Sequence, residues 1–426
     1  MADFATFKAH FKGDIVTPDD ADYPKAIARW AVNAQRHAKV VAFVRDEEDV
    51  RASIRYARDS GLSIAIRGGG HSPAGASSSE GGLVIDLSRY LNGVKVDAEK
   101  RVIHVGGGAL WDVVDKEAIK YGLATVGGTV NHTGVGGLIL GGGYGWLSPE
   151  HGLAIDNLVQ ATVVTADGSV LIASDKENPD LFFGIRGGGC NFGVVTEFVL
   201  RLHPQRKTVY AGMLVFPPPV LEQLVEVTQK WRERAGEKEA MFQVMTMGPD
   251  GKASNLLSNN QALFHGQGIY MKGIAHREPR YESIKKAFDH VQKVSGPDFK
   301  ANILFEYLPL AKIGAVPSDR TAFRRDPTAS ILVLVIWKED TKENSDRGKS
   351  VAHELAELVV EGQQGVSPTQ IMGYSNYDPE AVAGKKELVS DKAMAVFADN
   401  YPRLQKIKKR YDPDSIFNKW FPITPA

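Results

Sequence analysis

Arg67-Gly68-Gly69-Gly70-His71-Ser72 is the stretch around which the chain is organised, and it follows an apolar run, 62–66, that predicts a buried strand. Three consecutive glycines allow a backbone to turn sharply and to approach another group closely. The free N–H groups of such a turn form a concave cradle that suits an anion such as a pyrophosphate. His71 would stand at the lip of that cradle as a nucleophile beside a bound dinucleotide. A short glycine motif with one histidine is also compatible with a purely structural turn.

The residues on either side decide which kind of nucleotide-binding fold is expected. A strand over 39–44 precedes a helix that Asp46 can cap, and Gly61 follows that helix as its C′ glycine. This βαβ-like start suggests a Rossmann domain, whose fingerprint requires the glycines to open a helix. Here they open a Ser/Gly-rich loop and then a further strand, 83–87. The sequence therefore argues against the Rossmann fold.

Length and composition bound the class of protein. With 426 residues, 43% of them hydrophobic and 24% charged, the chain predicts two or three domains with a sizeable core. Lys+Arg and Asp+Glu both number 51, so net charge gives no reason to expect nucleic acid or an anionic membrane as partner. The single cysteine, Cys190, allows no intrachain disulfide, and no His/Asp/Glu spacing suggests a metal. The N-terminus lacks a signal-peptide pattern, and the longest uncharged stretch, 133–149, is too glycine-rich for a membrane span, so an intracellular, cytoplasmic location is expected.

Two further glycine blocks follow the first. The block 134–145 holds so many glycines that no periodic helix is expected there, and it would lie against a flat ligand. A flexible linker is the alternative, but Leu138, Ile139 and Leu140 favour burial. Strands over 159–165 and 169–173 are predicted around a type-I′-like Asp167-Gly168 turn, and the third block occupies 186–193.

Composition changes near residue 205, where glycine becomes sparse and Pro217-Pro218-Pro219 marks a boundary. Beyond it, an antiparallel sheet backed by helices is expected, and the whole chain is assigned to the α+β class. The expected strands are 209–215, 241–247 and 331–337, and the expected helices are 220–235, 279–295 and 344–361. Near the C-terminus, Lys406, Lys408, Lys409 and Arg410 are interpreted as a solvated helix face.

Taken together and in order, the motifs resemble a known family. They are RGGGH (67–71), GVGGLILGGGYG (134–145), HGLAIDN (151–157), RGGGCNFGVVTE (186–197) and the ending NYPRLQKIKKRYDPDSIF (400–417). The set resembles the flavin-linked oxidases of the vanillyl-alcohol-oxidase superfamily, which have a PCMH-type FAD-binding domain. It is most similar to their berberine-bridge-enzyme and 6-hydroxynicotine-oxidase branch. The resemblance implies an FAD-binding domain over 1–205, a substrate-binding cap domain over 206–384, and a C-terminal segment over 385–426 that completes the first.

The resemblance also implies the cofactor and its contacts. The first glycine block would hold the FAD pyrophosphate, and His71 would bond covalently to the flavin 8α carbon. A long, flat dinucleotide with an anionic middle requires backbone N–H donors and glycine along its length. The residues implied around FAD are Arg67, Gly68, Gly69, Gly70, His71, Ser72, Val130, Gly134, Gly136, Gly137, Gly141, Gly142, Tyr144, Asp156, Asn157 and Val195.

The chain departs from the family pattern in three places. Val130 stands where doubly tethered members carry a cysteine, so a single covalent bond to the flavin is expected. Cys190 lies in another glycine block and is interpreted as a packing residue. The segment 417–421 lacks the usual Gln-containing ending, which leaves the local cover over the flavin open.

The stretch Tyr374-Ser375-Asn376-Tyr377 resembles the family's Tyr-x-Asn-Tyr motif, whose second tyrosine serves as a catalytic base in several members. A phenol with an ordinary pKa near 10 is a poor base, so Tyr377 would need a nearby cation, for which Arg325 is the candidate. The alternative for Tyr377 is a core tyrosine with its hydroxyl at the surface. His132 and His151 could face the flavin but are expected to be structural.

The expected function is an FAD-dependent oxidase. It would take a hydride from a C–H bond next to oxygen or nitrogen in an alcohol, carbohydrate or amine, and pass the electrons to O₂ to give H₂O₂. Thr129 is small and would leave O₂ access beside the flavin. The alternatives are a flavin-dependent oxidative cyclase or dehydrogenase of secondary metabolism, and a flavin-binding protein without turnover. A small-molecule substrate and O₂ are the expected partners, while the substrate's identity and the oligomeric state stay open.

Overall fold

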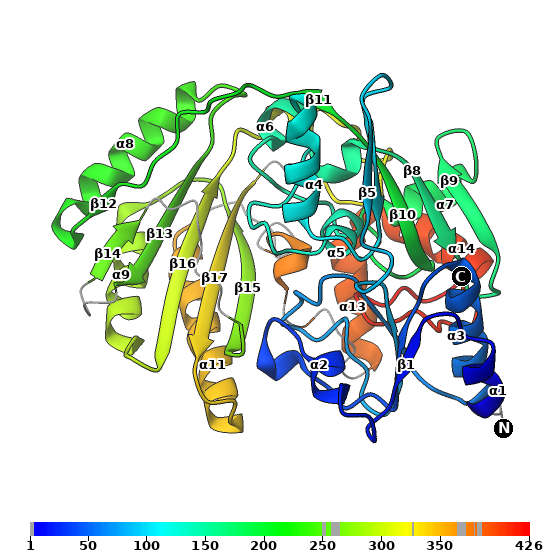
Figure 1. Cartoon of the computed structure of the whole chain (residues 1–426). Helices are drawn as coiled ribbons and strands as arrows, with labels where there is room; N and C mark the ends of the chain where they lie inside the picture. Colours follow the sequence, from blue (N-terminus) through cyan, green and yellow to red (C-terminus); the bar gives the residue numbers. More distant parts are fainter. Residues whose placement is uncertain are drawn as a thin grey trace.

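The computed structural model describes residues 4–248, 253–256, 265–325, 328–363, 372–378, 380 and 386–426. It shows two halves that lie side by side, with the N-terminal half and the C-terminal segment on one side and the third quarter of the chain on the other (Figure 1). The mixture of helices and sheets is the α+β arrangement expected from the sequence. Within the described residues, no helix combines the length and the apolar character needed to cross a membrane.

The first glycine block leaves the edge of a four-stranded sheet. Its strand order is β1-β2-β4-β3, with β2 and β3 both parallel to β4. Asp46 caps α3 as expected, because its carboxylate accepts hydrogen bonds from the Glu48 and Asp49 amides, and Gly61 follows the helix with φ +64°. The elements are α1 (Phe4–Ala9), β1 (Asp14–Val16), α2 (Tyr23–Ile27), β2 (Val40–Phe43), α3 (Glu47–Asp59), β3 (Ile64–Arg67) and β4 (Leu83–Asp86).

A five-stranded antiparallel sheet of order β5-β6-β10-β8-β9 follows, together with the short pair β7 and β11. Its buried face, with α4 and α7, forms the largest apolar core of the described residues. The elements are β5 (Val94–Asp97), β6 (Val102–Gly106), α4 (Trp111–Ala118), β7 (Leu123–Ala124), α5 (Val135–Leu140), α6 (Ser148–His151), β8 (Leu158–Val164), β9 (Val170–Ser174), α7 (Pro179–Ile185), β10 (Val194–Arg201) and β11 (His203–Pro204).

Two local predictions for this half are wrong. The second glycine block contains the six-residue helix α5, because burial of Val135 and Ile139 stabilises this short helix although its intrinsic helix propensity is low. The Asp167-Gly168 turn is not type I′, since only Gly168 has a positive φ, +85°. The Thr165 amide instead donates to the Ser169 carbonyl across a longer loop.

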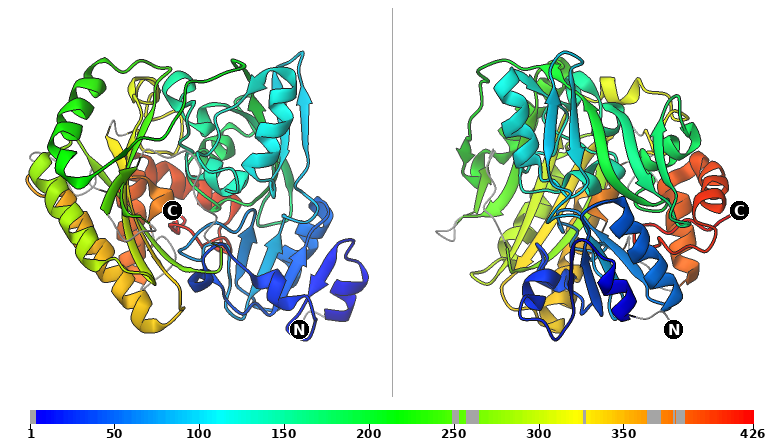
Figure 2. Two further views of the ribbon diagram at one scale, coloured as in Figure 1. Left: turned by 60° about the vertical axis from the view of Figure 1, so that its left-hand side comes forward. Right: turned by 45° about the vertical axis from the view of Figure 1, so that its right-hand side comes forward.

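The third quarter of the chain forms the expected antiparallel sheet, in the order β12-β14-β13-β16-β17-β15. Three long helices cover its outer face, and its other face is turned toward the N-terminal half (Figure 2). The strand predicted over 209–215 is wrong, because only its last residue is in β12. The elements are β12 (Val215–Phe216), α8 (Leu221–Arg234), β13 (Met241–Met247), β14 (Ala253–Leu256), β15 (Gly268–His276), α9 (Tyr281–Val294), β16 (Phe299–Tyr307), α10 (Ala311–Gly314), β17 (Ala329–Trp337) and α11 (Lys342–Val360).

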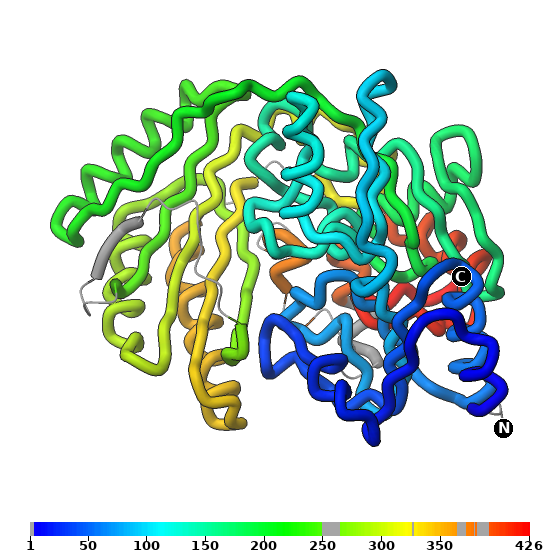
Figure 3. Tube along the Cα trace, in the orientation of Figure 1, coloured from blue at the N-terminus to red at the C-terminus, as the bar shows by residue number. Residues whose placement is uncertain are grey.

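The last segment returns to the N-terminal half as α13 (Lys386–Phe397) and α14 (Tyr401–Tyr411), so that both chain ends lie on the same side of the molecule (Figure 3). The basic run on α14 is not wholly solvated, as the sequence suggested. Lys408 is buried and its ammonium contacts the Asp412 carboxylate at 2.6 Å and the carbonyls of Asn191 and Phe417 at 2.7 Å. The domain boundaries at 205 and 384 stay predictions.

Candidate cofactor and active site

A cavity of about 250 Å³ lies between the glycine blocks and the inner face of the β13-β16-β17-β15 part of the sheet. Thirteen of the residues predicted for the site line it, from both halves of the chain. They are Gly68, Gly69, Gly70, His71, Ser72, Val130, Gly134, Gly136, Gly137, Gly141, Tyr144, Val195 and Tyr377. The tertiary structure therefore brings the first and second glycine blocks and the Tyr-x-Asn-Tyr motif to one site.

Direct contact between the first two glycine blocks explains part of their composition. A Cβ atom on Gly69 would lie 2.6 Å from the Cα of Gly134, and one on Gly134 would lie 2.5 Å from the amide nitrogen of Gly69. Both distances are far below an ordinary van der Waals contact, so neither position accepts a side chain. The two backbones together form one narrow wall of the cavity.

His71 lies in this wall with its ring stacked on Trp30, at 4.0 Å between centroids and 12° between planes. Its Nε2 atom is buried and has no hydrogen-bond partner among the described residues. Burial, together with the nearby His132 and His265 rings, lowers the pKa of His71 to about 3. The imidazole is therefore neutral and nucleophilic at physiological pH.

These features fit the cofactor that the sequence implies. The cavity is lined by the backbone of the glycine blocks, and the buried Ser77 and Ser78 hydroxyls have no hydrogen-bond partner among the described residues. Ser77 and His71 both line the cavity. Unpaired buried polar atoms are rare in folded proteins, and those at the cavity fit a bound group that would satisfy them. A dinucleotide with an anionic middle and a reactive methyl group at one end matches this arrangement.

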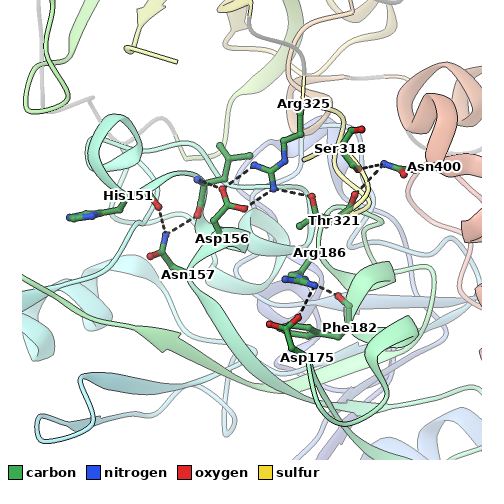
Figure 4. A network of polar contacts seen from close by, with 11 residues as sticks. His151, Asp156, Asn157, Asp175, Phe182, Arg186, Ser318, Thr321, Arg325 and Asn400 are labelled. Carbon is green, nitrogen blue, oxygen red and sulfur yellow. Dashed lines mark hydrogen bonds and ion pairs between the residues drawn. The ribbon is translucent and has the colours of Figure 1, made fainter. Parts of the chain in front are cut away.

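Four predicted residues do not line the cavity. The Arg67 guanidinium bonds the buried Asp86 carboxylate at 3.0 Å, and Gly142 packs under the Phe323 ring. Two oxygens of Asp156 accept hydrogen bonds from Arg325 at 2.6 and 2.9 Å (Figure 4). The Asn157 amide donates to the carbonyls of His151 and Leu153 and its Oδ1 faces His203.

Arg325 is thereby excluded as the cation that would activate Tyr377. Its guanidinium is 3% exposed and is committed to Asp156 and to the Thr321 hydroxyl (Figure 4). This ion pair joins the segment that precedes β17 to the short 3₁₀ turn η3 (Ala154–Asp156). His151 stacks on His203 and does not line the cavity, whereas His132 does.

The Tyr374-Ser375-Asn376-Tyr377 motif forms a short 3₁₀ turn, η5 (Ser375–Tyr377), between the two halves. The Tyr374 hydroxyl accepts a hydrogen bond from the Gly143 amide at 3.0 Å, and Asn376 packs directly against Gly141. The backbone of η5 lies close to β15, where a Cβ on Gly273 would be 3.0 Å from that of Tyr377. The motif thus anchors the second glycine block and directs Tyr377 into the cavity.

Glu306 is the functional candidate that sequence reasoning missed. The Tyr377 hydroxyl donates a hydrogen bond of 2.8 Å to its Oε1 atom. Burial raises the pKa of Glu306 to about 7, although the Tyr377 and Ser330 hydroxyls act in the opposite direction. A signal was present, since Glu306 is the one acidic residue in the apolar strand β16.

The pKa of Tyr377 shifts opposite to the direction expected from the sequence. Burial, and then the charge of Glu306, raise it well above 10.

Cys190, interpreted as a packing residue, also lines the cavity, and so do Thr129 and Trp420. Trp420 covers the third glycine block, since a Cβ on Gly189 would collide with its ring. The C-terminal segment thus supplies a wall of the site despite its atypical ending.

Comparisons with known proteins agree with this geometry. The FAD binding domain family matches residues 38–174, and the berberine and berberine like family matches 373–423. The FAD-linked oxidoreductase pgmH of Aspergillus terreus is 34% identical over 100% of this chain and 96% of its own length. The (R)-6-hydroxynicotine oxidase of Paenarthrobacter nicotinovorans is 40% identical over 50% of this chain and 46% of its own.

Solved structures agree as well. 6-Hydroxy-D-nicotine oxidase from Arthrobacter nicotinovorans superposes with a TM-score of 0.85 at 27% identity, over 98% of both chains. Glucooligosaccharide oxidase from Acremonium strictum, whose FAD is 6-S-cysteinyl and 8α-N1-histidyl, shares the fold with a TM-score of 0.83 at 22% identity, over 99% of both chains. The relatives, the glycine-lined cavity and the unpaired His71 together show that this chain is an FAD-dependent oxidoreductase of the vanillyl-alcohol-oxidase superfamily and belongs to its berberine-bridge-enzyme-like branch.

Proposed function

We propose that the protein is an oxidase that removes a hydride from a C–H bond next to oxygen or nitrogen and passes the electrons to O₂, giving H₂O₂. The observation that carries this proposal is the Glu306–Tyr377 pair, which faces the same cavity as His71 and the glycine blocks. FAD, when bound, supplies the hydride acceptor. The side chains then have to position the substrate and to take the proton from its hydroxyl or amine.

The pair is suited to that proton transfer. A general base works best when its pKa is close to the working pH, and Glu306 meets this condition with a pKa of about 7. Because its pKa is raised, Tyr377 is a poor final acceptor for the proton, but its hydroxyl can pass a proton on to Glu306. Its oxygen would accept the substrate's proton while its own proton passes to Glu306 Oε1. Tyr377 therefore keeps its proposed catalytic place, with Glu306 as the group that finally holds the proton.

The cofactor is proposed to be held by one covalent bond, from a His71 ring nitrogen to the flavin 8α carbon. Support comes from the neutral, buried imidazole with an unpaired Nε2. Val130 lines the cavity and supplies no second thiol tether. Arg67, Gly142, Asp156 and Asn157 would act on the cofactor only indirectly, through the segments that they hold in place.

Rapid-mixing measurements test the oxidase assignment. The holoenzyme is reduced without oxygen by a turned-over substrate and then mixed with air-saturated buffer. Fast reoxidation with one H₂O₂ per flavin is expected. Reoxidation that takes many minutes would instead identify a dehydrogenase. A flavin that no member of an amine, alcohol and carbohydrate panel reduces would favour a binding protein without turnover.

A further inference from the structure

The inner face of the cap sheet presents an almost wholly apolar wall to the cavity. Alternate residues of β17 point to opposite faces, so Leu332 and Leu334 face the cavity whereas Val333 faces the helices. The same alternation adds Leu304 on β16, Met271 on β15 and Phe242 on β13 to the wall. The wall therefore offers van der Waals contact and few hydrogen-bonding groups.

Glu306 is the exception in this wall. Phe242 on β13 and Ser330 on β17 lie directly opposite it on the two neighbouring strands, and Tyr377 approaches from η5. Of the described residues that line the cavity, none is a lysine, an arginine or an aspartate, and the two histidines are His71 and His132. Both histidines have lowered pKa values and are neutral. Among the described residues that line the cavity, the carboxylate therefore has no cation beside it.

A buried carboxylate without a cation is costly, and a positively charged ligand would lower that cost. An apolar wall has the opposite effect on a carbohydrate. Each sugar hydroxyl placed against Leu332, Leu334 or Met271 would lose its hydrogen bonds to water without replacement, and this loss would weaken carbohydrate binding. The Glu306 carboxylate and the apolar wall together favour a ligand with one cationic group and an apolar body.

We propose that the substrate is an apolar amine about the size of a substituted benzene ring that binds as a cation. Its protonated nitrogen would pair with Glu306, and its body would lie against the apolar wall of the cap sheet. This inference rests on the proposed function and narrows it from alcohols, carbohydrates and amines to amines. On oxidation the nitrogen gives a proton to the Tyr377 oxygen while the Tyr377 hydroxyl proton passes to Glu306, and the adjacent carbon gives a hydride to the flavin. The product is an iminium ion, and two electrons have passed from substrate to cofactor.

The test uses binding to the oxidised holoenzyme and needs no turnover. 2-Phenylpropan-2-amine has no hydrogen on the carbon next to nitrogen, so it can bind but cannot be oxidised there. Its alcohol counterpart, 2-phenylpropan-2-ol, has the same shape without the charge, and cellobiose represents carbohydrates. Dissociation constants are measured by calorimetry and by the change in the flavin absorption spectrum. We expect the amine to bind at least tenfold more tightly than the alcohol, and cellobiose not to bind.

The variants separate charge recognition from general damage to the site. Glu306→Gln should weaken amine binding at least tenfold and leave alcohol binding unchanged. Glu222→Gln, on the exposed side of α8, is the matched control and should bind as wild type does. Equal affinity for amine and alcohol, an amine affinity that survives Glu306→Gln, tight cellobiose binding or no amine binding would each overturn the proposal. Slow reaction with O₂ would refute the oxidase assignment and leave this binding result intact.

Discussion

The Tyr377 hydroxyl donates a hydrogen bond of 2.8 Å to Oε1 of Glu306, although the two residues come from different structural units, η5 and the cap strand β16. The carboxyl group is fully buried, and burial raises its pKa to about 7. At neutral pH the Glu306 carboxyl is therefore partly ionised, and the Tyr377 hydroxyl beside it stays protonated. In the proposed function this pairing would place the acid–base chemistry on the sheet of the third quarter of the chain, and Tyr377 links that sheet to the glycine-lined half.

Replacing Glu306 by glutamine should slow flavin reduction by about 10²–10⁴-fold, the usual contribution of general acid–base catalysis. The side chain keeps its shape, so FAD content should not change. Anaerobic stopped-flow absorbance at the flavin band measures the rate. Tyr377→Phe should slow reduction to a similar extent if the tyrosine relays the proton. A near-normal rate for Glu306→Gln would show that the proton acceptor lies elsewhere.

The rate of flavin reduction should depend on pH through Glu306. Its carboxyl must be deprotonated to act as a base, and its pKa is about 7. Below that value the rate should rise about tenfold per pH unit, and above it the rate should level off. The profile is measured by single-turnover reduction between pH 5 and 9. Glu306→Gln should remove the inflection, and a profile that is flat from pH 5 to 9 in the wild type would contradict the assignment.

Denaturation in acid tests the His71 tether. The wild-type precipitate should stay yellow and fluoresce on a gel, because a covalent bond survives unfolding. His71→Ala should release its flavin on denaturation and still bind it in the native state. Cys190→Ser is the control for the thiol that lines the same cavity, and it should keep the covalent flavin. Complete release of FAD from the acid-treated wild type would refute the histidyl bond, and a tether that survives His71→Ala would point to Cys190.

Removing the Lys408 ammonium should destabilise the fold rather than change the chemistry. Lys408 and Asp412 are 1% and 0% exposed, and Lys408→Met leaves a buried carboxylate uncompensated. We expect a loss of about 3–5 kcal/mol in the free energy of unfolding, from urea titration of the holoenzyme. Lys406→Met, at an exposed position on the same helix, is the control and should cost far less. If both variants unfold at the same urea concentration, the buried pair does not hold the C-terminal segment in place.

By itself, the sequence determined the features that rest on local backbone chemistry and on motif order. Gly68-Gly69-Gly70 next to His71, followed in order by the later blocks, resembles a known family, and this resemblance predicted the FAD-binding fold and a histidine at its cavity. Periodicity also predicted α8, α9 and α11 with the sheet that they cover. Such features are readable because a glycine's conformational range, or an apolar repeat, belongs to neighbouring residues.

Only the tertiary structure decided which partner each polar side chain meets. Glu306 is marked in the sequence only as the one acidic residue of an apolar strand, and it becomes a candidate base because strand alternation turns it toward Tyr377. Asp156, implied at the cofactor, turns instead to Arg325, and Lys408 in a basic run is buried against Asp412. Burial and pairing depend on segments far apart in the chain. Because they also set pKa values, the chemistry of this site was decided by packing, and the fold by sequence pattern.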